Sequence, residues 1–252
     1  NRCPGATIEV MGDLAVLRLL LDRSVVGAVS SFDRADLASL FQPAAVPGVP
    51  LRRYLEQFDF VLSYATPPEH VFAHNLARMA RGTVLNFDAR AVPGLGIHTS
   101  EYLQQPLREL GIATRAEPPR LAPTMADQQD AKQWWDEHGL DNQRVMAIHP
   151  GSGSPAKNWP ASRFAAVAQY LQCEHGAQVL LLSGPADASA VGQLREALDG
   201  QGYSLLNHLP LPLLAAILAR CYAYLGNDSG VSHLAAAVGV PVVVIFGPTD
   251  AE

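Results

Sequence analysis

A glycine- and serine-rich segment that contains a lysine follows a short apolar run and precedes a helical pattern. It reads Ile148-His-Pro-Gly-Ser-Gly-Ser-Pro-Ala-Lys-Asn-Trp-Pro160. Glycine lets a ligand approach the backbone, while serine hydroxyls, free N–H groups at a helix start and a lysine ammonium all bind phosphate. The segment therefore predicts a phosphate site made by Ser152, Gly153, Ser154 and Lys157. An ordinary strand-to-helix loop is the alternative.

A second polar segment, Gly226-Asn-Asp-Ser-Gly-Val-Ser-His-Leu-Ala-Ala-Ala-Val-Gly239, also joins an apolar run to a helical pattern. Asp228 or Ser229 can cap the helix, and Ser229 and His233 share one helical face. Gly230 lets a ligand or a neighbouring backbone come close. The segment predicts a helix N-terminus that faces a diphosphate, with His233 as a donor and Asp228 holding the loop. A capped helix with a buried histidine is the plainer interpretation.

Two shorter segments could complete a nucleotide site. Gly184 ends an apolar run in Leu182-Ser-Gly-Pro-Ala-Asp187, and Asp187 could cap the next helix or meet a ribose hydroxyl. Leu209, within Leu206-Asn-His-Leu-Pro210, could wall a slot for a base, although ordinary packing is the favoured explanation of a lone leucine.

Short apolar runs alternate with helical patterns along the chain. This alternation predicts parallel sheets with crossover helices, and such sheets bind ligands beyond the carboxyl ends of their strands. In the first half we expect strands at 6–10, 58–63 and 83–87 and helices at 34–41, 67–80 and 100–110. In the second half we expect strands at 144–149, 178–182, 203–206, 222–225 and 240–246 and helices at 127–138, 160–174, 187–198, 211–219 and 229–238.

A break in periodicity indicates two domains. Residues 113–126 contain three prolines, which is typical of a linker. We predict an N-terminal Rossmann-like domain at 1–125 and a C-terminal one at 126–252, with a cleft between them. The chain begins with Asn and ends where an α/β unit would enter its next helix, so we expect truncation at both ends.

Composition argues against several classes of protein. The formal net charge of −6 disfavours sequence-independent binding to nucleic acid, which needs a basic face. Three widely spaced cysteines predict free thiols in a reducing compartment rather than a disulfide frame or a zinc site. No apolar run is long enough for a transmembrane helix. No Gly-x-Gly-x-x-Gly follows a strand, which counts against a plain NAD-dependent enzyme.

The four segments together resemble glycosyltransferase family 9, the family of the lipopolysaccharide heptosyltransferases. His149-Pro-Gly-Ser-Gly153 and Lys157-Asn-Trp-Pro160 look like its strand–loop–helix. Gly226-Asn-Asp-Ser-Gly-Val-Ser-His233, with Phe246-Gly-Pro-Thr-Asp250, looks like its most distinctive stretch. These motifs cover about 148–250, and the first half agrees in general pattern only.

The resemblance implies a GT-B fold, which is α/β with two Rossmann-like parallel-sheet domains facing a cleft. It also implies inverting transfer from a nucleotide sugar, often ADP-heptose, with no metal or other cofactor, and the sequence has no Asp-x-Asp pattern. By resemblance, the C-terminal domain binds this donor. The residues implied at phosphate are Ser152, Gly153, Ser154 and Lys157. Those implied at the diphosphate and sugar are Asp228, Ser229, Gly230 and His233. Those implied near ribose and base are Asp187 and Leu209.

Such a transfer needs two kinds of help from the protein. Without a metal, Lys157, the helix start near Ser229 and His233 must stabilise the leaving oxygen. A carboxylate should take the proton of the attacking hydroxyl. Family members carry this base in an N-terminal Gly-Asp loop, which invites Asp13. However, residues 4–10 look like the family's second strand, so we expect the base on a loop missing here, with Asp13 the weaker candidate.

The resemblance further implies an anionic, lipid-linked glycan acceptor on the N-terminal domain. It also implies a cytoplasmic protein in peripheral contact with the inner face of the inner membrane. Two rivals share the fold: a sugar-nucleotide epimerase, and a non-catalytic relative that binds ADP without transferring. Cations that could meet the acceptor, although a solvated surface explains most of them equally well, are Arg52, Arg53, Arg78, Arg81, Arg90, His70, His74 and His98.

Overall fold

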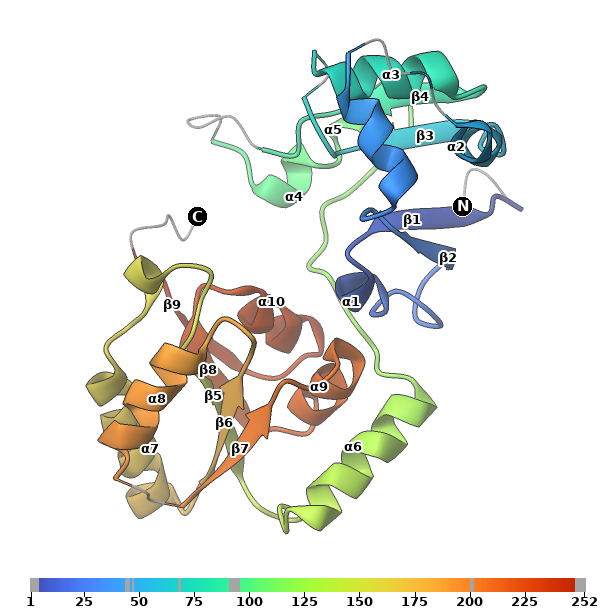
Figure 1. The fold of residues 1–252 in the computed structure, drawn as a ribbon. Helices are drawn as coiled ribbons and strands as arrows, with labels where there is room; N and C mark the ends of the chain where they lie inside the picture. The colour runs from blue at the N-terminus through green and yellow to red at the C-terminus, as the bar shows by residue number, and fades with distance from the viewer. Residues whose placement is uncertain are drawn as a thin grey trace. The chain divides into compact units, whose positions relative to one another are not determined.

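The computed structural model describes residues 5–43, 46, 48–67, 69–90, 96–199 and 202–247. Contacts divide the chain into two compact units, each described here by itself. The first comprises Asn1–Leu14 and Ala28–Glu117, and the second comprises Ala15–Gly27 and Pro118–Glu252. Figure 1 shows the elements of both units in chain order.

The second unit is built on a five-stranded sheet with the order β7-β6-β5-β8-β9. All four pairings are parallel, so the carboxyl ends of the strands meet at one edge of the sheet. The bounds confirm the strands expected in this half: β5 (Val145–His149), β6 (Gln178–Ser183), β7 (Tyr203–Asn207), β8 (Ala223–Asn227) and β9 (Val242–Ile245).

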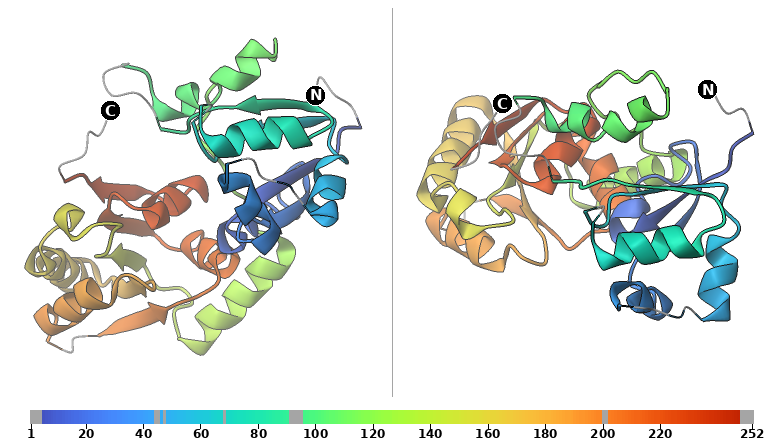
Figure 2. Two further views of the ribbon diagram at one scale, coloured as in Figure 1. Left: turned by 45° about the horizontal axis from the view of Figure 1, so that its top comes forward. Right: turned by 90° about the horizontal axis from the view of Figure 1, so that it is seen from above.

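Helices cover both faces of this sheet (Figures 1 and 2). Alternate strand residues face opposite sides, so Val179 and Leu181 pack on one side of the sheet and Leu180 on the other. One side carries α6 (Met125–Glu137), α9 (Leu211–Leu218) and α10 (Gly230–Ala237). The opposite side carries α7 (Ala161–His175) and α8 (Ala188–Ala197).

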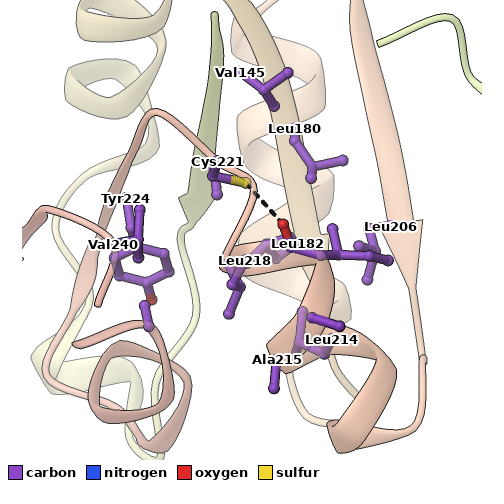
Figure 3. Close-up of a cluster of buried hydrophobic side chains, with 14 of the residues drawn as sticks. Val145, Leu180, Leu182, Leu206, Leu214, Ala215, Leu218, Cys221, Tyr224 and Val240 are labelled. Carbon is purple, nitrogen blue, oxygen red and sulfur yellow. Dashed lines mark hydrogen bonds between the residues drawn. The ribbon is translucent and has the colours of Figure 1, made fainter. Parts of the chain in front are cut away.

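Figure 3 shows part of the core beneath α9 and α10, where aliphatic side chains from the strands meet those of the helices. Cys221 lies in this core, and its Sγ donates a weak hydrogen bond to the carbonyl oxygen of Ile217 at 3.6 Å. Burial raises the pKa of the Cys221 thiol to about 12, so it stays protonated at neutral pH. It therefore acts as a core residue.

Two segments distant from the sheet in sequence are bonded to helices of the second unit. Thr124 and Asp127 form a reciprocal capping box, and the Arg23 guanidinium pairs with the Asp127 carboxylate. Leu121 N donates to the Ala237 carbonyl oxygen at 2.8 Å. The later part of the expected linker, 113–126, is thus bonded to the second unit.

The described residues of the first unit form two separate two-stranded sheets. One pairs β1 (Ile8–Gly12) with β2 (Val26–Ser31), and the other pairs β3 (Phe60–Ser63) with β4 (Thr83–Asn86) in parallel. A single apolar cluster contacts both sheets through Met11 and Val61. The remaining elements are the 3₁₀ helix η1 (Ala35–Phe41), α2 (Val49–Leu55), α3 (Val71–Met79), α4 (Thr99–Tyr102) and α5 (Gln105–Glu109). The short helix α1 (Leu14–Leu17) begins at the last residue of the first segment and belongs otherwise to the second unit.

Several expectations for the first half were wrong in detail. Neither β2 nor α2 was predicted, because one run mixes glycine and serine with valine and the other is short and contains proline. The helix expected from 67 begins at Val71, where His70 Nδ1 accepts the N–H of Phe72 at 3.1 Å. Pro67 therefore precedes the helix, and Pro68 lies outside the described residues. The helix expected at 34–41 is the 3₁₀ helix η1, and Arg34 precedes it without a side-chain cap hydrogen bond.

Leu181 and Leu205 stand opposite each other on β6 and β7, yet Leu181 is fully buried and Leu205 is 36% exposed. We expect Leu181→Ala to lower the free energy of unfolding by about 2–5 kcal/mol, because the cavity cannot close fully. Leu205→Ala is the matched control and should cost roughly half as much or less. Urea unfolding followed by tryptophan fluorescence measures both, since all three tryptophans belong to the second unit. Equal losses would contradict this account of the core.

Candidate functional site

Side chains from three predicted segments meet at the carboxyl edge of the five-stranded sheet. Lys157 follows β5, Asp187 follows β6, and Asp228 follows β8. Parallel pairing of these strands explains the meeting, because each chain leaves the sheet at the same edge. The structure thus joins Lys157 to Asp228, which lies 71 positions later in the sequence.

Asn227, the last residue of β8, is fully buried and ties the two main loops together. Its Nδ2 donates to the Pro150 carbonyl oxygen at 2.8 Å, and its Oδ1 accepts the N–H of Trp159 at 2.9 Å. The amide thereby fixes both ends of the loop that carries Lys157. Sequence reasoning gave Asn227 no role, although a polar residue at the end of an apolar run was the available signal.

Lys157 ends the short 3₁₀ turn η2 (Pro155–Lys157). Its Nζ donates to Asp228 Oδ2 at 2.7 Å, with side chains 29% and 17% exposed. A Cβ at Gly247 would lie 3.2 Å from Lys157 Cα, so the chain after β9 passes close to this turn. The two predicted ligands therefore neutralise each other, and an anion would have to share Lys157 with Asp228.

The N-terminus of α10 is capped by Ser229, whose Oγ accepts the N–H of Ser232. Ser229, rather than Asp228, is therefore the cap of this helix. His233 is not the buried histidine of the plainer interpretation, because its side chain is 77% exposed, with Nε2 3.8 Å from Asp228 Oδ1. A Cβ at Gly230 would meet nothing within 4 Å, so open space rather than a neighbouring backbone lies beside this residue.

Asp187 makes different contacts from those expected. It precedes α8 but its side chain forms no cap hydrogen bond, so the capping prediction was wrong. Its Oδ2 instead lies 2.8 Å from His149 Nε2 and accepts the N–H of Gly184, also at 2.8 Å. The hydrogen bond with His149 lowers the pKa of the Asp187 carboxyl, against the opposing effect of burial. The carboxylate therefore stays ionised at neutral pH.

His149 extends this contact toward α10. It is 3% exposed, and its Nδ1 lies 3.4 Å from Ser229 Oγ. Asp187, His149 and Ser229 thus form one hydrogen-bonded series, which we call the relay. Sequence reasoning quoted His149 within a motif and assigned it no function. A histidine at the carboxyl end of a buried strand was the signal.

The remaining predicted residues differ in what surrounds them. Ser152 Oγ lies 2.7 Å from both the Ser154 carbonyl oxygen and Asn158 Oδ1, so its single proton is used inside the loop. A hollow of about 410 Å³ lies beside this loop, between it and the start of α8, and Gly153 and Asp187 help to line it. Leu209 is half-buried and packs against the core under α9.

The candidates in the first unit have mostly local partners. Asp13 is exposed between β1 and α1. His98 Nδ1 accepts the N–H of Ser100 at 3.1 Å at the start of α4, as His70 does for α3. Arg90 pairs with Asp88 at 3.0 Å. His98, His70 and Arg90 therefore bond to residues close to them in sequence.

The model of "Glycosyltransferase family 9 (heptosyltransferase)" matches residues 97–252. The chain belongs to this family. It is 31% identical over 123 residues to "Lipopolysaccharide heptosyltransferase 2" of Escherichia coli K12, covering 46% of this chain and 35% of that protein. "Lipopolysaccharide heptosyltransferase 1" of Pseudomonas aeruginosa is 32% identical over 124 residues, which are 45% of this chain and 34% of that protein. The matches therefore span about a third of the length of these relatives.

Solved structures share the fold over nearly the whole chain. The family 9 glycosyltransferase of Veillonella parvula DSM 2008 aligns with a TM-score of 0.77 at 20% identity, over 98% of this chain and 74% of that one. "E. coli heptosyltransferase WaaC with ADP" aligns with a TM-score of 0.66 at 19% identity, over 99% and 80%. Together with the parallel pairing above, these likenesses confirm the predicted α/β GT-B fold class.

The described ranges contain neither a candidate membrane span nor a candidate metal cluster. Within them no helix has both the length and the apolar character required to cross a bilayer. The same residues contain no group of three or more histidine, cysteine, aspartate or glutamate side chains that could hold a metal ion.

Gly151 and Gly153 offer a matched test of the relay's packing. A Cβ at Gly151 would lie 2.0 Å from Asp187 Oδ1, whereas one at Gly153 would meet nothing within 4 Å. We expect Gly151→Ala to displace Asp187 and to lower the free energy of unfolding by about 1–3 kcal/mol. Gly153→Ala should leave it within about 0.5 kcal/mol of wild type. Urea unfolding measures both, and a neutral Gly151→Ala would show that the relay is not tightly packed.

Proposed function

We propose that this chain carries the donor site of an inverting, metal-independent glycosyltransferase that moves heptose from ADP-heptose onto lipopolysaccharide core. The observation that carries the proposal is the convergence of Lys157 and the N-terminus of α10 at one edge of the sheet, in a family 9 chain. The curated relatives are named lipopolysaccharide heptosyltransferases. Two neighbours in fold are titled as complexes with ADP and with ADP-2-deoxy-2-fluoro heptose.

In this proposal the donor diphosphate lies between Lys157 and the first turn of α10. The free N–H groups of that turn and its partial positive charge favour an anion. Lys157, which pairs with Asp228 alone in this structure, would then share its hydrogen bonds with the phosphate oxygens. The exposed His233 would donate a further hydrogen bond. The open space beside Gly230 admits the ligand. Backbone groups of Gly153 and Ser154 would complete the phosphate contacts.

The nucleoside end of the donor would lie toward the ends of β6 and β7. Gly184 and Asp187 follow β6, and Leu209 follows β7. Because Asp187 Oδ2 already has two partners, any ribose contact would use its other oxygen. We assign Leu209 to the base side because its side chain packs against the core but is only half-buried, which leaves apolar surface for a base.

The transfer itself follows from these positions. An acceptor hydroxyl attacks the anomeric carbon on the face opposite the diphosphate, the bond from that carbon to the diphosphate oxygen breaks, and the configuration inverts. Lys157 and the start of α10 stabilise the charge on the leaving oxygen. A carboxylate takes the hydroxyl proton. We propose that this base belongs to the acceptor-binding part of the enzyme, with Asp13 as a candidate in this chain.

The acceptor in this proposal is the lipid-linked core glycan, met in the cytoplasm at the inner face of the inner membrane. No cofactor and no nucleic acid takes part. A non-catalytic relative that binds ADP without transferring is the second candidate, and the pairing of Lys157 with Asp228 is the observation in its favour. Release of ADP from ADP-heptose in the presence of acceptor separates the two.

The chain's two lysines provide a matched pair for testing the donor site. Lys157→Ala should weaken ADP binding by at least tenfold, because a charge-assisted hydrogen bond to phosphate is lost (about 1.5–3 kcal/mol). Lys132→Ala, on an exposed part of α6, should leave it unchanged. Calorimetric titration with ADP, UDP, GDP and CMP measures affinity and selectivity. Equal affinity of both variants, or no nucleotide binding by folded wild type, would contradict the proposal.

A further inference from the structure

The hydrogen bonds that link Asp187, His149 and Ser229 were given no role in the transfer described above, yet the first two residues are buried at the site. Asp187 is 7% exposed and His149 is 3% exposed. The low pKa of the Asp187 carboxyl means that it is ionised and can only accept hydrogen bonds. His149 Nε2 therefore carries a proton whether the ring is neutral or charged, and Nδ1 is the ring atom that can change.

Ser229 Oγ has one proton, for which Ser232 Oγ and His149 Nδ1 are acceptors inside the protein; it also shares a hydrogen bond with the Tyr224 hydroxyl. Ser232 Oγ donates to the Asn227 carbonyl oxygen at 2.5 Å, so toward Ser229, 3.1 Å away, it acts as an acceptor. Nδ1 of a neutral His149 is the other acceptor, at 3.4 Å. While His149 is neutral, the Ser229 proton is held within the protein and the hydroxyl has none to offer to a phosphate.

Protonation of His149 reverses the second of these contacts. Nδ1 becomes a donor to Ser229 Oγ, and one of the two internal acceptors is removed. A positive charge also appears directly behind the cap of α10, and an anion at the helix N-terminus favours that charged form. The Ser229 proton can then point toward a phosphate oxygen.

We propose that His149 is a positioning residue, and that a diphosphate at the start of α10 binds with uptake of one proton by His149, which turns the Ser229 hydroxyl toward the ligand. The inference rests on the proposed function, since it requires a nucleoside diphosphate at this helix. Uptake on binding means that affinity rises as pH falls. For a full proton the change approaches tenfold per pH unit.

Other ionisable groups around His149 limit which residue can take the proton. Burial raises the pKa of Tyr224 to about 12, so this phenol stays protonated. Lys157 and Asp228 pair with each other, and Asp187 is ionised. The other histidines near the relay are His208, whose charge would act on Asp187, and His233, which faces Asp228.

Calorimetric titration with ADP in buffers of different ionisation enthalpy measures the number of protons taken up. We choose a pH of about 7.5, where the second ionisation of a phosphate, near pH 6, contributes little. Wild type should take up a measurable fraction of one proton. The uptake should vanish in His149→Asn and fall in Ser229→Ala, while Ser229→Thr, which keeps the hydroxyl, should retain it.

Substitutions of two other histidines show whether the proton uptake is specific to His149. His175→Gln, at the exposed end of α7, and His233→Gln should keep the uptake, although the second should bind ADP more weakly. A purely structural His149 would change stability and affinity without changing the proton count. If His149→Asn does not fold, as judged by thermal unfolding, Ser229→Ala and Ser229→Thr still decide the question.

Each outcome has a distinct meaning. ADP binding with no proton uptake, or with full uptake in Ser229→Ala, would overturn the inference and leave the proposed function intact. Loss of the uptake in His233→Gln alone would assign the proton to His233 and also overturn it. Absence of ADP binding by folded wild type would overturn the proposed function together with the inference.

Discussion

The buried amide of Asn227 is the contact on which the candidate site depends. Its oxygen and nitrogen bond the two ends of the loop after β5, so the turn that carries Lys157 is held against the end of β8. An amide can donate and accept at once, which a carboxylate or an aliphatic side chain cannot do. Without it, the carbonyl of the buried Pro150 would lose this donor, and an unsatisfied buried group is costly.

A second constraint is electrostatic. Asp187 and Asp228 bring negative charge to an edge of the sheet that we propose binds a diphosphate. Each carboxylate has its own partner, His149 for one and Lys157 for the other. The two pairs differ in exposure, because the first is buried and the second is open to solvent on one side. The buried pair can therefore serve as fixed framework, while the other can exchange its partner for a ligand.

Likeness of fold covers more of the chain than likeness of sequence does. Likeness of fold extends over 98% of it, whereas the family model begins at residue 97 and the first curated relative matches 46%. The matched region contains the sheet edge with Lys157, Asn227 and Asp228. Sequence likeness is therefore shown for the part of the chain that carries the candidate site, and likeness of fold alone for most of the rest.

Sequence by itself determined the order of elements in the second unit and the segments that meet at its edge. Runs such as 179–182 are apolar throughout, as buried parallel strands require, and this signal is local. Local patterns failed where structure depends on distant partners. β2 was missed because its run mixes glycine and serine with valine, and it forms only by pairing with β1.

Only the tertiary structure decided what the site residues do. Asp187 looks like a helix cap in sequence, but His149, 38 residues away, holds its carboxylate instead. Ser229 caps α10 and also contacts that histidine across 80 residues. Whether a polar side chain serves its own helix or a distant partner depends on which groups folding brings within about 3 Å, and spacing along the chain does not encode that distance.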